Sequence, residues 1–161
     1  GNLVGYGLDF GFTNSPTALA EVRLLDDNLY IKELLYETRL TNLDVANKLR
    51  ELGISRTAEI IGDSAEPKSI EEIYRQGFNI KPSNKGAGIH LGIDIMRRYK
   101  IHITKDSLNA IKEFQSYKWV TDKNGNVLNT PVKVNDHLLD AIRYLCLNKL
   151  SVNNSGKYYI L

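Results

Sequence analysis

Near its start the chain reads Leu3-Val4-Gly5-Tyr6-Gly7-Leu8-Asp9-Phe10-Gly11. The apolar residues of this stretch predict a buried strand, and the small residues that follow it predict a turn. This pattern places Asp9 at the end of a strand. The segments 17–25 and 29–38 are two further expected strands, joined by a polar turn, so the chain is expected to open with an antiparallel meander of three strands.

Beyond the meander the apolar spacing alternates between helical and strand periods, which predicts an α/β fold with a mixed central sheet and flanking helices. Helices are expected at 42–52, 68–76, 89–99 and 136–150, and strands at 58–62, 78–81 and 101–103. A further helix is expected to carry Leu108, Ile111 and Phe114 on its apolar stripe, with Asp106 or Ser107 as its cap. An Asn-Gly pair, Asn124-Gly125, lies between the β-prone runs 115–120 and 127–134 and predicts a projecting β-hairpin.

Composition excludes several classes of protein. A length of 161 residues with 42% hydrophobic and 25% charged residues is typical of one ordered domain, with an expected core at 3–150 and a tail at 151–161. The net charge of only +2 argues against binding of nucleic acid by bulk charge alone. The single cysteine, Cys146, excludes a disulfide framework within the chain and favours an intracellular setting. No apolar run is long enough for a membrane span, and no signal peptide is recognisable.

Three aspartates lie where expected elements begin or end. Asp9 follows the first strand, Asp63 follows the strand 58–62, and Asp140 lies in the last helix. If the two strands are neighbours, both aspartates emerge at one edge of the sheet, where a helix packed across it can present Asp140. Clustered carboxylates repel one another unless a cation such as Mg²⁺ or Mn²⁺ stabilises their charged form. Two such cations about 3.5–4 Å apart can activate a water and stabilise the leaving oxygen of a phosphodiester.

Each of these residues also has an ordinary structural interpretation. Asp9 can stabilise the turn that follows it, Asp63 can cap the next helix, and Asp140 can be an exposed helix charge. His137 lies one turn before Asp140, where it can act as an additional ligand, orient a water or be a plain surface residue. Asp136 can join the site, although its position favours a role as helix N-cap.

Three segments, read together, resemble the nuclease domain of the large terminase subunits of tailed double-stranded DNA phages. They are Gly7-Leu8-Asp9-Phe10-Gly11, Asp63-Ser64-Ala65-Glu66-Pro67-Lys68-Ser69-Ile70 and Asn135-Asp136-His137-Leu138-Leu139-Asp140-Ala141-Ile142-Arg143-Tyr144. The similarity runs from about Gly5 to Leu150 in matching order and spacing, and the second and third segments are specific. It implies a ribonuclease H-like fold.

The resemblance also implies a function. In that family the equivalent aspartates bind the catalytic metals, which carries over to Asp9, Asp63 and Asp140, and His137 matches a histidine at the same site. The implied activity is an endonuclease with two divalent cations, Mg²⁺ or Mn²⁺, that cuts concatemeric viral double-stranded DNA during packaging. The implied setting is the host cytoplasm, at the procapsid, with the portal, the small terminase subunit and an N-terminal ATPase domain as partners. This sequence contains no Gly-x-x-x-x-Gly-Lys-Ser/Thr phosphate loop, so ATP use is not expected of it.

Two segments are further candidates for DNA contact. Lys85 and Gly86 precede an expected helix, where a cation and backbone amides can meet a phosphate, although a plain connector fits equally well. The expected hairpin carries three lysines, Lys118, Lys123 and Lys133. In the resembled family a hairpin at this place lies beside the active site, while Trp119 can equally be a packing anchor.

Three alternative functions remain open at this point. Asp9-x-Gly11-x-Thr13-Asn14 resembles the phosphate-binding turn of actin-like and sugar-kinase-like ATPases, but that superfamily needs a second, repeated domain for which 161 residues leave no room. A Holliday-junction resolvase shares the expected fold and chemistry and differs in substrate. A non-catalytic DNA-binding or portal-binding module would keep the fold without needing all three aspartates.

Overall fold

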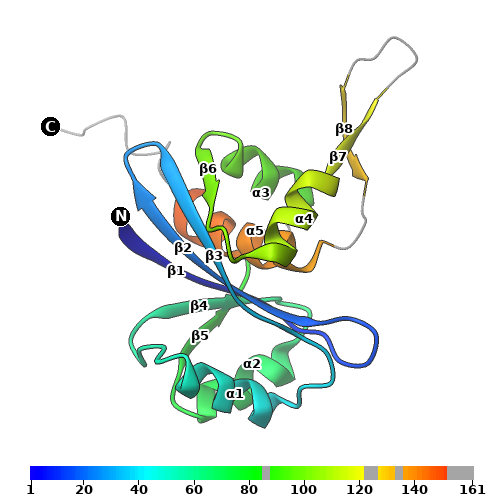
Figure 1. Cartoon of the computed structure of the whole chain (residues 1–161). Helices are drawn as coiled ribbons and strands as arrows, with labels where there is room; N and C mark the ends of the chain where they lie inside the picture. The colour runs from blue at the N-terminus through cyan, green and yellow to red at the C-terminus, as the bar shows by residue number, and fades with distance from the viewer. Residues whose placement is uncertain (85–87, 122–126, 133–135, 152–161) are drawn as a thin grey trace, which may run out of the picture.

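A six-stranded mixed sheet forms the centre of the molecule, in the order β5-β4-β1-β2-β3-β6 (Figure 1). The computed structural model describes residues 1–84, 88–121, 127–132 and 136–151, and for residues 89, 90, 118–121 and 127–132 it describes the backbone alone. The strands of this sheet are β1 (Asn2–Asp9), β2 (Thr17–Leu25), β3 (Asn28–Glu37), β4 (Glu59–Gly62), β5 (Asn79–Pro82) and β6 (Lys100–Ile103).

The first three strands form the antiparallel meander that the sequence predicts. β4 pairs in parallel with β1, β5 in parallel with β4, and β6 in parallel with β3. Asp26 closes the turn between β2 and β3 with a positive φ of 53°, a conformation that aspartate tolerates better than most residues. The two strands that precede the candidate aspartates, β1 and β4, are therefore direct neighbours.

In the described part of the chain, five helices cover the two faces of the sheet (Figure 1). They are α1 (Asn42–Glu51), α2 (Pro67–Arg75), α3 (Gly88–Met96), α4 (Leu108–Ser116) and α5 (His137–Leu150). α1 and α2 pack on one face, where Leu8, Leu19 and Ile60 of the sheet meet Leu49 and Ile73 of the helices. The helices α3, α4 and α5 pack on the other face over a second cluster of buried apolar side chains. The predicted α/β fold with flanking helices is confirmed.

α5 lies close against β1 because Gly7 carries no side chain. A Cβ atom at Gly7 would overlap the backbone carbonyl oxygen of Ala141, so any other residue here would force the helix away from the strand. Strand side chains alternate between the two faces, and Asp9 therefore points to the same face as Gly7. The close contact brings β1 and α5 together near the C-terminal end of β1, where Asp9 lies.

Three local predictions need correction. α3 ends at Met96, before the predicted end at Tyr99, because Arg98 N–H bonds the carbonyl of Ile95 and closes a tight last turn. The segment Gln115–Ser116 belongs to α4 and not to the hairpin. Leu108, predicted to lie on the apolar stripe of this helix, is 70% exposed, whereas Ala110 and Glu113 are the buried residues. The buried stripe of α4 includes a carboxylate.

The predicted hairpin is present as a separate two-stranded sheet of β7 (Lys118–Thr121) and β8 (Val127–Val132) (Figure 1). The residues 122–126 and 133–135, and all of the predicted tail except Ser151, lie outside the described residues. Among the described residues, the helices are all too short or too polar to cross a lipid bilayer.

Candidate metal centre

Strand pairing brings Asp9 and Asp63 to the same edge of the sheet. Leu8 of β1 pairs with Gly62, the last residue of β4, in parallel register, and the residue that follows each of them in the chain is one of the two aspartates. The loop after β4 is held in place by Ser83, whose hydroxyl accepts a hydrogen bond from Ser64 N–H at 3.1 Å. The condition on which the sequence argument depended, that these two strands are neighbours, is confirmed.

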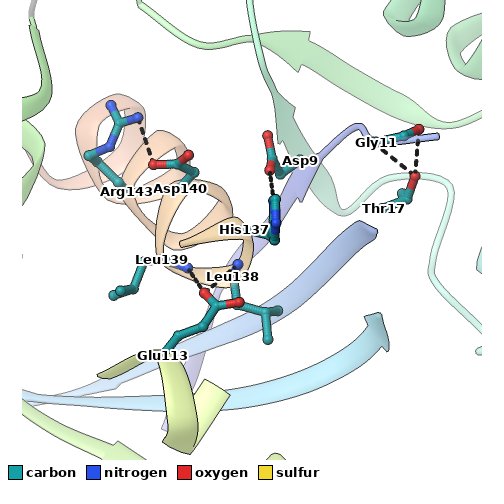
Figure 2. A network of polar contacts seen from close by, with 9 residues as sticks. All are labelled: Asp9, Gly11, Thr17, Glu113, His137, Leu138, Leu139, Asp140 and Arg143. Atoms are coloured by element: carbon teal, nitrogen blue, oxygen red, sulfur yellow. Dashed lines mark hydrogen bonds and ion pairs between the residues drawn. The ribbon is translucent and has the colours of Figure 1, made fainter. Parts of the chain in front are cut away.

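Asp9 faces the first turn of α5 (Figure 2). Its Oδ2 lies 3.5 Å from Nδ1 of His137, and only 8% of Asp9 is exposed. The loop after Asp9 is stabilised separately, because Gly11 and Thr17 exchange hydrogen bonds of 3.2 and 3.3 Å. The alternative in which Asp9 serves that turn is therefore not what the structure shows.

Asp140 lies on the same helical turn and pairs with a different residue (Figure 2). Its Oδ1 lies 3.1 Å from Nη2 of Arg143, one turn further along α5. Arg143 is 8% exposed, packs over the ring of Tyr144 at 4.9 Å and fills the space that Gly92 of α3 leaves open. Asp140 is thus a partly buried member of an ion pair and not an exposed helix charge.

Asp63 lies in the turn after β4 and is only partly buried. Its Oδ1 accepts a hydrogen bond from Ala65 N–H at 2.9 Å and so stabilises its own turn. The N-cap of α2 is Glu66, whose side chain makes no capping bond. The interpretation of Asp63 as that cap is wrong. Asp136, by contrast, does occupy the N-cap position of α5, although its side chain makes no cap hydrogen bond.

Negative charge is concentrated around these side chains. Burial raises the pKa of Asp9, with further increases from Asp63 and Asp136, while the contact with His137 opposes the shift. Burial likewise raises the pKa of Asp140 to about 6, against the opposing effect of Arg143. The contact with Asp9 raises the pKa of His137.

The pKa of one side chain, Tyr144 of α5, is affected by the charges of all three aspartates. The pKa of the Tyr144 hydroxyl is raised by burial and, in addition, by the charges of Asp9, Asp140 and Asp63. The charges of the three carboxylates therefore all act on the hydroxyl of one tyrosine of α5.

The carboxylates are not already arranged as a ligand cage. Within the described part of the chain, no group of three or more His, Cys, Asp or Glu side chains is placed to hold a metal ion. His137 contacts one oxygen of Asp9 and Arg143 contacts one oxygen of Asp140, so a cation bound at these carboxylates would share them with the two side chains. The donor set itself, three carboxylates and an imidazole, consists of ligand types that divalent cations accept.

Sequence reasoning missed two residues next to this site. Glu113 of α4 is 3% exposed, and its Oε1 accepts hydrogen bonds from Leu138 N–H at 2.8 Å and Leu139 N–H at 3.1 Å (Figure 2). Tyr36 of β3 packs edge-on against His137 with ring centres 6.2 Å apart. The sequence did offer a signal for Glu113: a glutamate three residues after Ala110 lies on the same face of the helix, so a buried Ala110 implies a buried carboxylate.

The candidate DNA-contacting residues remain predictions. Lys85, Gly86, Lys123 and Lys133 lie outside the described residues, and Lys118 is described by its backbone alone, as the first residue of β7.

A cavity of about 680 Å³ opens between the loop after β1 and the first turn of α2. It is lined by residues that include Phe10, Phe12 and Lys68, and by none of the four candidate ligands.

Comparison with known families identifies the family of this chain. A family model described as the terminase RNase H-like domain matches residues 9–146. The chain belongs to this family. The match begins at Asp9 and extends beyond Asp140, so it includes both ends of the candidate centre.

Two relatives of this terminase domain are whole large subunits. The PBSX phage terminase large subunit of Bacillus subtilis (strain 168) is 34% identical over 143 residues, which cover 86% of this chain and 33% of the relative. The terminase large subunit of Bacillus phage SPP1 is 30% identical over 148 residues, with 86% of this chain and 34% of the relative covered. The chain therefore spans about a third of the length of these proteins.

Solved structures of terminase nuclease domains share the fold. The g2p large terminase nuclease domain of bacteriophage SPP1, solved with bound Mn, superposes with a TM-score of 0.79 and 27% identity over 91% of this chain and 85% of that domain. The P22 large terminase nuclease domain superposes with a TM-score of 0.68 over 90% of this chain and 80% of that domain, at 19% identity. The predicted ribonuclease H-like fold and the predicted family are both confirmed.

Proposed function

We propose that this terminase domain is a metal-dependent endonuclease that cleaves phage double-stranded DNA by phosphodiester hydrolysis. Asp9, Asp63, Asp140 and His137 are its proposed metal-binding and catalytic residues. The observation that carries the proposal is the convergence of three chain segments at one edge of the sheet: Asp9 and Asp63 follow paired positions of β1 and β4, and the first turn of α5, which carries Asp140, contacts Asp9 through His137.

The charge balance at this edge supports cation binding. Asp9 and Asp140 are largely buried, and burial of carboxylates in the charged form is unfavourable without a compensating positive charge. Arg143 compensates Asp140 through their ion pair, and His137 contacts Asp9. Divalent cations would supply the larger compensation that three carboxylates require. Mn bound to the related SPP1 domain is consistent with this chemistry.

We propose two cations, Mg²⁺ or Mn²⁺, held by the three aspartates. When bound, they supply Lewis-acid stabilisation of the phosphate and lower the pKa of a water. Asp9 at the end of β1, Asp63 after β4 and Asp140 on α5 would hold them through their carboxylate oxygens. His137 in its neutral form offers a ring nitrogen as a ligand or as an acceptor that orients the attacking water.

The proposed substrate is concatemeric viral DNA, cut into genome units during packaging. The proposed partners are an ATPase domain within the full-length large subunit, the portal and the small terminase subunit, with action in the host cell at the procapsid. Lys85, Gly86 and the lysines of the hairpin, Lys118, Lys123 and Lys133, are proposed DNA contacts. Family membership favours this function over a resolvase, an actin-like ATPase fragment or a non-catalytic module.

The test is cleavage of supercoiled plasmid by the purified chain in Mn²⁺, Mg²⁺ or EDTA. We expect nicking and linearisation with either metal and none in EDTA. Asp9→Asn, Asp63→Asn and Asp140→Asn should each abolish cleavage, because each removes one anionic ligand.

A matched control is Asp27→Asn, in the exposed turn at the far end of β2, which should cleave as the native chain does. Cleavage that persists in EDTA would show that the activity does not depend on a divalent cation. Cleavage that persists in both single variants, Asp9→Asn and Asp63→Asn, would show that the active site does not include these aspartates.

A further inference from the structure

The first turn of α5 is capped from another helix. Its N-cap residue, Asp136, makes no side-chain cap hydrogen bond. The N–H groups of Leu138 and Leu139 instead donate to one carboxylate oxygen of Glu113, at 2.8 and 3.1 Å. Glu113 lies on α4, so this cap joins two helices that are separate in the sequence (Figure 2).

Burial of this carboxylate requires an explanation beyond packing. Glu113 is 3% exposed, and its second oxygen, Oε2, has no hydrogen-bond partner among the described residues. A buried carboxylate costs free energy unless the contacts it makes offset the loss of solvation. An apolar residue of similar size would avoid this cost but would leave the two buried N–H groups without an acceptor. The contacts to Leu138 and Leu139 are therefore what Glu113 provides.

These two N–H groups lie between the residues of the proposed metal centre. His137 precedes Leu138, and Asp140 follows Leu139. A carboxylate that holds both amides fixes the rotation of the first turn about the helix axis and its position along that axis. On this turn His137 points to Asp9, and Asp140 pairs with Arg143 (Figure 2). Tyr36 adds a second restraint, because its ring packs edge-on against His137. The charge of Glu113 also raises the pKa of the Tyr36 hydroxyl, after the larger effect of burial.

We propose that Glu113 is a positioning residue of the metal centre, which sets the first turn of α5 so that His137 and Asp140 face the same cations as Asp9. This inference rests on the proposed function. It assigns Glu113 no contact with metal or substrate, and it depends on the reach of the side chain as a hydrogen-bond acceptor rather than on its charge.

Reach and charge can be separated by two substitutions. Glu113→Gln keeps the length of the side chain and one acceptor oxygen but removes the charge. Glu113→Asp keeps the charge but is one methylene shorter, so it cannot reach both amides without moving the helix. Positioning predicts that Gln restores most of the metal affinity and that Asp does not. A direct electrostatic role predicts the reverse order.

The experiment measures the dissociation constant of Mn²⁺ without DNA, from the electron paramagnetic resonance signal of the free ion, together with cleavage as a function of Mn²⁺ concentration. Loss of a residue that orients metal ligands commonly weakens metal affinity by about 10- to 100-fold. We expect a weakening of that order for Glu113→Asp and Glu113→Ala, with cleavage recovered at high Mn²⁺. Lys112→Ala, at an exposed neighbouring position on α4, is the matched control.

Each outcome decides one of the two proposals. If Glu113→Asp and Glu113→Gln both bind Mn²⁺ as the native chain does, or if Gln is the weaker binder, the positioning role is wrong. Glu113→Asp and Glu113→Gln carry the test even if Glu113→Ala does not fold. A native chain that binds no Mn²⁺, or an Asp9→Asn variant that binds it unchanged, would instead reject the metal centre itself.

Discussion

The helices α1 and α5 begin in different ways. α1 has a local cap: the hydroxyl of Thr41 accepts from Asp44 N–H at 3.1 Å, and Asp44 Oδ2 accepts from Thr41 N–H at 2.9 Å. α5 receives its cap from Glu113, 25 residues before Leu138. A local cap stabilises one helix wherever that helix lies, whereas a distant cap also fixes one helix relative to another. The difference indicates that the start of α5, and not that of α1, is held in a defined position relative to another helix.

The surroundings of the two caps differ in the same sense. The hydrogen bonds of Thr41 are exposed to solvent, and the core beneath α1 and α2 is made of apolar side chains. Among the described residues, the buried charged side chains are Asp9, Glu113 and Arg143, and all three contact α5 or belong to it. Buried charge in this fold is concentrated where the proposed chemistry lies.

The largest expected effect on stability comes from removal of the distant cap. Glu113→Ala should lower the free energy of unfolding at pH 7 by about 2 to 5 kcal/mol. Two buried N–H groups lose their acceptor, at about 1–3 kcal/mol each, and removal of a buried carboxylate offsets part of this loss. Urea denaturation followed by circular dichroism measures the change. A loss no larger than that of a local cap would remove the contrast between the two helices.

A second prediction concerns pH. Burial raises the pKa of Glu113 from its ordinary value of 4.5 to about 7, so the folded state favours the protonated form. The stability gained from this protonation is complete below about pH 4.5 and is lost as the pH rises through about 7. Glu113→Gln cannot titrate at this position. The native chain should therefore lose up to about 3 kcal/mol relative to Glu113→Gln between pH 4.5 and pH 8, at about 1.4 kcal/mol per pKa unit.

Urea denaturation of both proteins across this pH range provides the measurement. Two curves that run parallel from pH 4.5 to pH 8 would mean that Glu113 does not titrate differently in the folded and unfolded chains.

The smallest effect is expected for the local cap. Thr41→Ala should lower the free energy of unfolding by about 1 kcal/mol, the usual value for an exposed N-cap. It should leave the dissociation constant of Mn²⁺ unchanged, because α1 contributes no residue to the proposed centre. Thermal denaturation and Mn²⁺ titration of the same sample check both parts. A change in metal affinity here would show that any loss of stability weakens the centre.

Local signals in the sequence were sufficient for most of the fold. The apolar spacing of α1 and the stop at Gly53, which has a positive φ of 72°, fixed that helix to within a residue. The Asn-Gly pair located the hairpin of β7 and β8. Asp9 and Asp63 could be placed at strand ends, since a strand end is a local property. Their adjacency required the pairing of β1 with β4, which the sequence could state only as a condition.

The partners of the site residues could not be predicted, because they come from distant parts of the chain. The spacing of His137 and Asp140 predicted a common helix face, but not that one contacts Asp9 while the other pairs with Arg143. Glu113 is the clearest case. Its place on a buried stripe was visible, but its role depends on the two N–H groups that α5 brings to it. Leu108 was wrongly assigned to that stripe, because the face of α4 that is buried depends on how the helix packs against distant parts of the chain.

The contact of α5 with β1 at Gly7 also has a consequence for the time at which the protein becomes active. The proposed centre takes ligands from β1 and α5, and the ribosome releases β1 more than a hundred residues before α5. A nascent chain that has emerged only as far as the hairpin contains Asp9 and Asp63 but neither Asp140 nor His137. The proposed centre is therefore incomplete until α5 has emerged and docked on β1.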